Sequence, residues 1–386
     1  MNIPLSRRCL DVTPFLAMEI MERAKALEAA GRDIIYLCLG EPDFPTPQPV
    51  LEAAVAALRG GATSYTHSLG LIELRQAISD HYRRRYRVDI DPGRILVSAG
   101  TSPLLLMLCA ALLESGDEVI LPDPGYSCYP NFVRFAGGRP VWLRTRVEDG
   151  FQPRLEDVRD LLTARTRAVL INSPSNPVGT ILSAERLEQL ATLPVPLIAD
   201  EIYHGLTYHG EEHSILEFTD QAFVLGGFSK TFAMTGWRLG FLIAPSACIR
   251  PLQSLHQNFM ICANHFVQRA GIAALAECGQ ELAEMRQTYD ARRHYLLERL
   301  NELGLKVAGQ PVGAFYALAE VRHIDPDSKR LALDILEQTG VALTPGVDFG
   351  AAAEGYLRFS YANSLTHLKK ALDRLEIYLR RRSASP

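Results

Sequence analysis

Short apolar runs alternate with longer amphipathic segments along the middle of the chain. From about residue 90, β-branched or apolar runs occur at ILVSA, EVILP, VWLRT, AVLIN, PLIAD and FVLGG. Most segments between them have helical periodicity or loop chemistry. This alternation predicts a mostly parallel sheet with helices on both faces. The run GWRLGFLIAP follows FVLGG too closely for a helical crossover, so we expect it to enter the sheet antiparallel.

The two ends of the chain differ from this pattern. Thr13 and Pro14 predict the start of a helix, as N-cap and first helical residue, and Gly31 predicts its end. After about residue 280, a charged helix, further strands and a last amphipathic helix predict a smaller α+β domain. We therefore expect three parts: an N-terminal segment that joins the small domain (1–45), a large domain (46–280) and a small domain (281–386).

Charge and hydropathy exclude several classes of protein. The net charge of −4 provides no basic field for nucleic acid. The longest apolar run, residues 104–113, is half the length of a membrane span and predicts a buried helix. The first fifteen residues lack the apolar core of a signal peptide. We expect no membrane or nucleic-acid partner and a cytoplasmic location.

The cysteines and histidines give no sign of a disulfide framework or a metal site. The seven cysteines are scattered, odd in number and without a C-x-x-C pair, which is typical of reduced thiols. His204, His209 and His213 lie close in sequence, but their spacing matches no common metal motif. We interpret them as ordinary loop residues and expect no metal.

Polar residues follow several of the predicted strands at their carboxyl ends. Ligands of an open α/β sheet bind beyond these ends, so we expect the residues there to meet at one rim. They provide a turn with free N–H groups, an aromatic ring, an amide, a carboxylate, a phenol and an amine. The candidates are Gly100, Thr101, Tyr126, Asn176, Asp200, Tyr203, Ser229 and Lys230.

Three of these positions have a functional and a plain structural interpretation. The turn at Thr101 could bind a phosphate at a helix N-terminus, or merely cap that helix. Lys230 lies in a segment too apolar for a solvated face, so its amine could lose its proton and attack a carbonyl. Asp200 ends a buried run and could pair with a protonated pyridine nitrogen, or cap the segment that follows.

Four other residues are ambiguous from the pattern alone. Tyr126 could belong to the core, and Asn176 before a proline is equally well a turn residue. Arg238 could be a charge on an edge strand. Arg358 lies between apolar neighbours in YLRFSYA, where a solvent-facing position is the alternative to a binding role.

Six blocks of the sequence resemble the class I aminotransferases of fold type I, which depend on pyridoxal 5′-phosphate. They occur in the family's order as GEPDFPTP, PDPGYSCY, NSPSNPVG, ADEIY, GGFSKTFAMTGWRLG and YLRFSYAN. The block around Lys230 is the most specific, and the resemblance extends from about Thr13 to the last helix. It implies a mixed, mostly parallel seven-stranded sheet with helices on both faces, plus the smaller α+β domain.

The resemblance also implies roles around the cofactor ring. Lys230 would carry the cofactor as a Schiff base and act as acid and base on the substrate. Asp200 would keep the pyridine nitrogen protonated. Tyr203 and Asn176 would hydrogen-bond the phenolic oxygen, and Tyr126 would stack on the ring.

Other matched residues would hold the phosphate and the substrate. The phosphate ligands would be Gly100, Thr101, Ser229 and Arg238. Tyr65 would reach the phosphate of a neighbouring subunit, which implies a homodimer with shared sites. Arg358 would bind the substrate carboxylate with two hydrogen bonds, helped by the backbone N–H of Gly40. Asn176 and Tyr126 would also contact the substrate.

The reaction implied is transfer of an amino group from an L-amino acid to a 2-oxo acid, by a ping-pong route, in amino acid metabolism. A C–S β-lyase on the same fold is an alternative, because it would share Lys230, Asp200 and Arg358. A ligand-sensing regulator domain is a third possibility. It would need a DNA-binding module before Thr13, where the matched blocks leave no room.

Two departures concern the substrate side chain. Family members that are specific for aspartate carry a basic residue for the distal carboxylate. At one such position this chain has Thr101, and at another His256 is the nearest basic residue. We therefore do not expect strict aspartate specificity. Phe15, Met260 and Ile261 could line an apolar pocket instead, or belong to the core.

Overall fold

A computed structural model describes residues 3–383 and contains one large mixed sheet of seven strands. Its order is β2-β8-β7-β6-β5-β3-β4. The strands are β2 (Ile95–Ser98), β3 (Glu118–Asp123), β4 (Arg139–Arg144), β5 (Thr166–Asn172), β6 (Leu197–Asp200), β7 (Phe223–Gly227) and β8 (Gly240–Ile243). Only β8 runs antiparallel to its neighbours, so the predicted mixed sheet and the antiparallel GWRLGFLIAP strand are confirmed.

Both faces of this sheet are buried under helices. Alternate residues of β3 enter different cores: Ile120 packs on one side, whereas Val119 and Leu121 pack on the other. Strands that are buried on both faces have continuous apolar sequences, and for this reason the sequence predicted them. The covering helices are α3 (Gln48–Arg59), α4 (Ile72–Tyr86), α5 (Thr101–Leu112), α6 (Tyr129–Phe135), α7 (Leu155–Leu161), α8 (Ala184–Ala191), α9 (Ser246–Phe259) and α10 (His265–Glu277).

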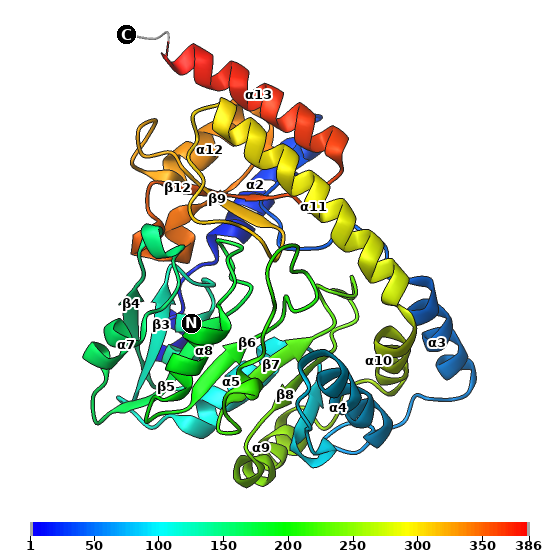
Figure 1. Cartoon of the computed structure of the whole chain (residues 1–386). Coiled ribbons are helices and arrows are strands. Elements are labelled where there is room, and N and C mark those ends of the chain that lie inside the picture. The colour runs from blue at the N-terminus through cyan, green and yellow to red at the C-terminus, as the bar shows by residue number, and fades with distance from the viewer. Residues whose placement is uncertain (1–2, 384–386) are drawn as a thin grey trace.

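The start and the end of the chain pack together in another core, on one side of the large sheet (Figure 1). The strand β1 (Ile35–Tyr36) pairs in parallel with β10 (Val341–Ala342). A second small sheet has the order β11-β12-β9. The other elements of this part are α2 (Leu16–Ala29), α11 (Gly279–Glu302), β9 (Tyr316–Glu320), α12 (Ser328–Thr339), β11 (Thr344–Pro345), β12 (Tyr356–Ser360) and α13 (Leu365–Ser383), whereas the short helix α1 (Arg7–Leu10) lies against α6.

The first long helix does not begin where the sequence predicted. Thr13 is not its N-cap: α2 starts at Leu16, and Thr13 instead hydrogen-bonds the side chain of Asn131. The carboxylate of Asp348 accepts hydrogen bonds from the N–H groups of Leu16 at 2.9 Å and Ala17 at 3.3 Å. A side chain more than three hundred residues away thus takes the place of the local cap.

Two further expectations concern the whole chain. All seven cysteines are free thiols, as the sequence predicted. None of the helices in residues 3–383 combines the length and the apolar character that a bilayer crossing needs.

Candidate active site

A cavity of about 360 Å³ lies beyond the carboxyl ends of β5, β6 and β7, beside the start of α5. Residues from both ends of the chain close it on the other side. Its lining includes most of the residues singled out in the sequence: Gly40, Thr101, Tyr126, Asn176, Asp200, Tyr203, Ser229, Lys230, Arg238 and Arg358. The predicted meeting of separate strand ends at one rim is therefore what the structure contains.

Lys230 lies just after β7 and is half-buried in this cavity. Its Nζ donates a hydrogen bond to the carbonyl oxygen of Gly40 at 2.6 Å. Burial lowers the pKa of Lys230 to about 8. The nearby cations Arg358 and Arg238 also lower this pKa, whereas the carboxylates of Glu41 and Asp200 raise it. A substantial fraction of the amine is thus neutral near physiological pH, as a nucleophilic lysine requires.

Asp200 ends β6 with both carboxylate oxygens engaged. The hydroxyl of Tyr129 donates to Oδ2 at 2.6 Å, and the N–H of Ile202 donates to Oδ1 at 3.2 Å. Burial raises the pKa of Asp200, while the hydrogen bond from Tyr129 lowers it. Sequence reasoning missed Tyr129, although it stands three residues after Tyr126, at the start of α6.

A second residue missed in the sequence is Tyr316, at the start of β9. Its hydroxyl lies 2.9 Å from the hydroxyl of Tyr203, and both rings are buried. The ring of Tyr316 also faces Arg358, with 4.3 Å between the guanidinium carbon and the ring centroid. Tyr316 therefore connects the side of the cavity near Tyr203 with the side that carries Arg358.

Arg358 is only 2% exposed, so its solvent-facing interpretation is wrong. Nη1 donates to Oδ1 of Asn176 at 2.9 Å, and Nη2 donates to the carbonyl oxygen of Cys38 at 2.6 Å and to Thr344 Oγ1. Its Nε has no partner among the described residues. The partners are neutral, and a buried charge without a counter-ion is costly. This guanidinium is consequently suited to receive an anionic ligand.

The start of α5 forms an anion cradle with Arg238. Gly100 has a positive φ of 97°, and a Cβ placed there would lie 2.5 Å from Nη2 of Arg238. Only glycine leaves room for that side chain. The free N–H groups at the helix start and the guanidinium are the groups that bind phosphates in proteins.

Tyr65 lies outside this cavity of its own chain and is 79% exposed, so its contact with the site of a neighbouring subunit stays a prediction. His256 is fully buried and lies 3.0 Å from Ser98 Oγ, so it is not available to a substrate. Of the apolar candidates, Phe15 lines the cavity and contacts Tyr126 edge-on, whereas Met260 and Ile261 do not line it.

Comparison with known proteins decides the family. The model of the family described as aminotransferase class I and II matches residues 32–375. The aspartate/prephenate aminotransferase of Thermus thermophilus is 41% identical over 378 residues, which are 96% of this chain and 97% of that protein. The chain belongs to the class I and II aminotransferases.

Other relatives agree with this assignment. The (5-formylfuran-3-yl)methyl phosphate transaminase of Methanocaldococcus jannaschii is 37% identical over 97% of this chain and 99% of that protein. A solved structure of the Thermus thermophilus aspartate aminotransferase with maleate superposes with a TM-score of 0.94 and 39% identity. It covers 97% of this chain and all of the other. The fold is therefore the fold type I of this family.

The aminotransferase uses pyridoxal phosphate, and the cavity fits that cofactor. A phosphate suits the Gly100–Arg238 cradle, in which a side chain at position 100 would collide with the arginine. An aldehyde suits the buried amine of Lys230, whose pKa is about 8. A protonated ring nitrogen suits the carboxylate of Asp200 at the buried end.

Proposed function

We propose that this cavity is the transamination site, with Lys230 as the residue that binds the cofactor and moves the substrate proton. The observation that carries the proposal is one cavity that holds a lysine with a depressed pKa, a buried carboxylate and a buried guanidinium whose hydrogen-bond partners are all neutral. No separate structural purpose accounts for all three, since each is costly to bury.

When bound, pyridoxal phosphate supplies an aldehyde and a pyridinium ring that withdraws electrons from the substrate. Lys230 would first act as the nucleophile of the protein and later, as a free amine, would remove a proton from the substrate α-carbon and return it to the carbon that the cofactor's aldehyde supplies. Asp200 holds the proton on the ring nitrogen, and the hydroxyl of Tyr129 keeps this carboxylate oriented.

Around the ring, Tyr126 supplies a stacking surface, and Tyr203 and Asn176 donate hydrogen bonds to its phenolic oxygen. Tyr316 orients the Tyr203 hydroxyl. The phosphate ligands proposed are Gly100, Thr101, Ser229 and Arg238, together with Tyr65 of a second subunit. These assignments rest on the family resemblance and on the positions of the side chains around one cavity.

Arg358 binds the α-carboxylate of the amino acid and of the 2-oxo acid in this proposal. Its guanidinium is fixed between the rings of Tyr316 and Phe349 and by the hydrogen bond to Asn176. The backbone of Gly40 lies on the same wall and contributes its N–H. A planar cation held this way recognises a carboxylate with little loss of conformational freedom.

The substrate side chain is proposed to be uncharged or aromatic rather than strictly acidic. The cations among the described residues that line the cavity are Lys230, Arg238 and Arg358, and each already has a role. Phe15 and Met18 are among the apolar side chains that line it. Relatives include an aromatic-amino-acid aminotransferase of Thermococcus litoralis, 36% identical over 98% of this chain and all of that protein.

We further propose a cytoplasmic homodimer with shared active sites. Apolar side chains on the surface of the single chain support it: Tyr65 and Phe259 are 79% and 70% exposed. The free cysteines agree with a reducing compartment. The proposed domains are 46–280 and 281–386, with 1–45 joining the latter, as the pairing of β1 with β10 supports.

The half-reaction tests the proposed activity. Holoenzyme is mixed with one amino acid and no acceptor, and the cofactor is extracted and identified. A transaminase accumulates pyridoxamine phosphate, whereas a β-lyase releases ammonia and a 2-oxo acid with the cofactor unchanged. A panel of aspartate, phenylalanine and leucine as donors, with pyruvate or 2-oxoglutarate, then ranks the substrates.

A further inference from the structure

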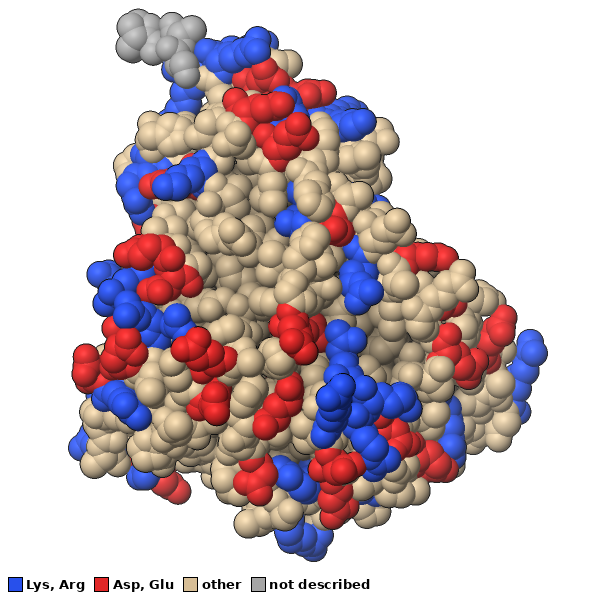
Figure 2. Space-filling model, in the orientation of Figure 1, with Lys and Arg blue, Asp and Glu red and all other residues tan. Residues whose placement is uncertain are grey.

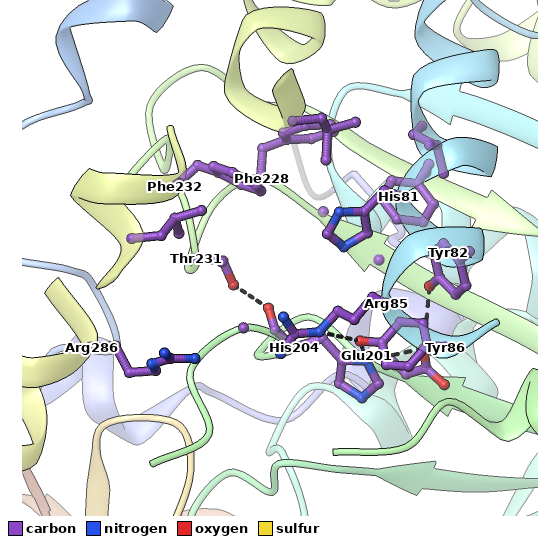
Figure 3. A pocket seen from close by; sticks show the side chains of 18 of the residues that line it. His81, Tyr82, Arg85, Tyr86, Glu201, His204, Phe228, Thr231, Phe232 and Arg286 are labelled. Carbon is purple, nitrogen blue, oxygen red and sulfur yellow. Dashed lines mark hydrogen bonds and ion pairs between the residues drawn. The ribbon is translucent and has the colours of Figure 1, made fainter. Parts of the chain in front are cut away.

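The chain has a second cavity, of about 230 Å³, and Figure 3 shows side chains that line it. It is enclosed by α4, by the turn after β6, by β7 and by the junction of α10 and α11. None of its lining residues belongs to the active-site cavity, so the two spaces are distinct. The transamination mechanism gives this space no role.

The two cavities share a wall that is one residue thick. In four pairs of consecutive residues, one member lines the active site and the other lines the second cavity. The pairs are Asp200 and Glu201, Tyr203 and His204, Ser229 and Phe228, and Lys230 and Thr231. Thr231 Oγ1 also donates a hydrogen bond to the carbonyl oxygen of His204 at 2.5 Å. A displacement of either residue therefore moves the backbone of Lys230 or Tyr203.

The acidic groups at this wall are already satisfied. Glu201 accepts hydrogen bonds from Ser214, Ile215 and Tyr82. The carboxylate of Glu212 lies 2.7 Å from the guanidinium of Arg85. Burial raises the pKa of Glu212, but the nearby His204 and Arg85 lower it further, to about 2. A cationic ligand would find no free carboxylate here.

Some of the basic side chains at this cavity, in contrast, have nitrogen atoms without a hydrogen-bond partner among the described residues. His204 lies in the turn after β6; its side chain is 9% exposed, and Nε2 has no partner among the described residues. His81 has a pKa lowered to about 4 by burial and by nearby Arg85 and Arg84. On α11, Arg286 forms no hydrogen bond or ion pair within residues 3–383, and Figure 3 draws it at the edge of the cavity.

Apolar side chains make up most of the remaining wall. They are Ile78, Phe228, Phe232, Phe241, Leu275 and Leu282. Lys and Arg side chains also gather over α4 on the outer surface (Figure 2). The cavity thus combines an aromatic interior with positive charge at its edge, which suits a small organic anion with an apolar body.

We propose that this second cavity is an effector site for a small aromatic carboxylic acid, whose carboxylate meets Arg286 and whose ring packs among the phenylalanines. Binding orders His204 and Thr231 and so changes the turnover set by Tyr203 and Lys230. The coupling rests on the roles proposed for those two residues, whereas the binding itself does not.

Benzoate is the probe, with benzamide as its neutral counterpart. Calorimetric titration of the holoenzyme measures binding, and steady-state kinetics with varied amino donor measure coupling. Arg286→Gln removes the charge, Ala283→Trp fills the cavity edge, and Arg84→Gln removes an exposed charge of α4 that does not line the cavity.

We expect benzoate to bind and to change kcat at saturating donor. Arg286→Gln and benzamide should each weaken binding roughly tenfold or more, because a charge-assisted hydrogen bond is lost.

Ala283→Trp should abolish binding at this site, and Arg84→Gln should leave it within about twofold of wild type. Absence of saturable binding overturns the proposal. So does binding that survives both cavity variants but disappears in Arg358→Gln, because the probe then occupies the active site. Binding without a change in kcat overturns the effector role. Turnover without benzoate tests the proposed function separately.

Discussion

Lys230 and Arg358 are two cations in one cavity, the first half-buried and the second buried, and they respond to this environment differently. The amine of Lys230 can give up its proton, and its pKa is lowered to about 8. The guanidinium of Arg358 keeps its charge and is stabilised by neutral acceptors and two aromatic rings. One residue is therefore prepared for nucleophilic attack and the other for an anion.

Capture of the cofactor by apoenzyme should follow the ionisation of Lys230. Only the neutral amine attacks an aldehyde, so the second-order rate should rise with pH and level off above about 8. For a lysine with an ordinary pKa, the rate would continue to rise until about pH 10.4. Stopped-flow absorbance after mixing apoenzyme with pyridoxal phosphate gives the profile. Nα-acetyl-lysine provides the control, and a protein profile that matches it contradicts the lowered pKa.

Arg358→Gln should weaken use of the amino acid. Loss of one charge-assisted hydrogen bond corresponds to about 1.5–3 kcal/mol, or roughly 10- to 150-fold in kcat/KM. The absorbance of bound cofactor should remain, since the residue serves the substrate in this account. Arg322→Gln, at an exposed position, is the matched control. Equal kcat/KM values in the two variants would argue against a substrate role.

The sequence indicated the cavity residues that end strands, because a strand end is a local pattern. It did not indicate Tyr129 or Tyr316, which act through contacts with residues 71 and 113 positions away. For Arg358, the pattern left the solvent-facing and buried positions open. Arg358 is buried because it packs against Phe349 and Tyr316, and the local sequence pattern does not predict these contacts.

At the scale of elements, the start of α2 depends on a distant carboxylate. Asp348 accepts from the first two N–H groups of the helix, a task that nearby Ser, Thr or Asp side chains usually perform. The sequence predicted Thr13 because it assumed a local cap. The strands of the large sheet other than the largely exposed edge strand β4, by contrast, were predictable because burial on both faces leaves a continuous apolar run.

Asp348→Ala should loosen the first turn of α2. Loss of a cap costs about 0.5–2 kcal/mol, which corresponds to a roughly 2- to 30-fold faster amide exchange at Leu16–Met18. Hydrogen exchange with mass spectrometry measures this directly. Asp327→Ala is the matched control, since Asp327 caps α12 through the N–H of Arg330. Exchange in α2 that is equal in both variants would contradict the long-range cap.

At the scale of the whole molecule, Tyr65 is the test of the proposed shared site. It lies outside the cavity of its own chain and is exposed there. Lys230→Ala and Tyr65→Ala subunits, each of low activity alone, should regain part of the wild-type activity when mixed. In a heterodimer one of the two sites then contains both intact residues. Heterodimers that form without any gain would show that Tyr65 does not cross the interface.

The central claim concerns a single amine. The chain has six lysines: Lys25, Lys230, Lys306, Lys329, Lys369 and Lys370. Borohydride reduction of the holoenzyme, followed by peptide mass spectrometry, identifies the lysine that holds the cofactor. We predict one pyridoxyl group per chain, on Lys230, and none in the Lys230→Ala variant. A pyridoxyl group on another lysine, or no covalent label in the wild-type protein, would contradict it.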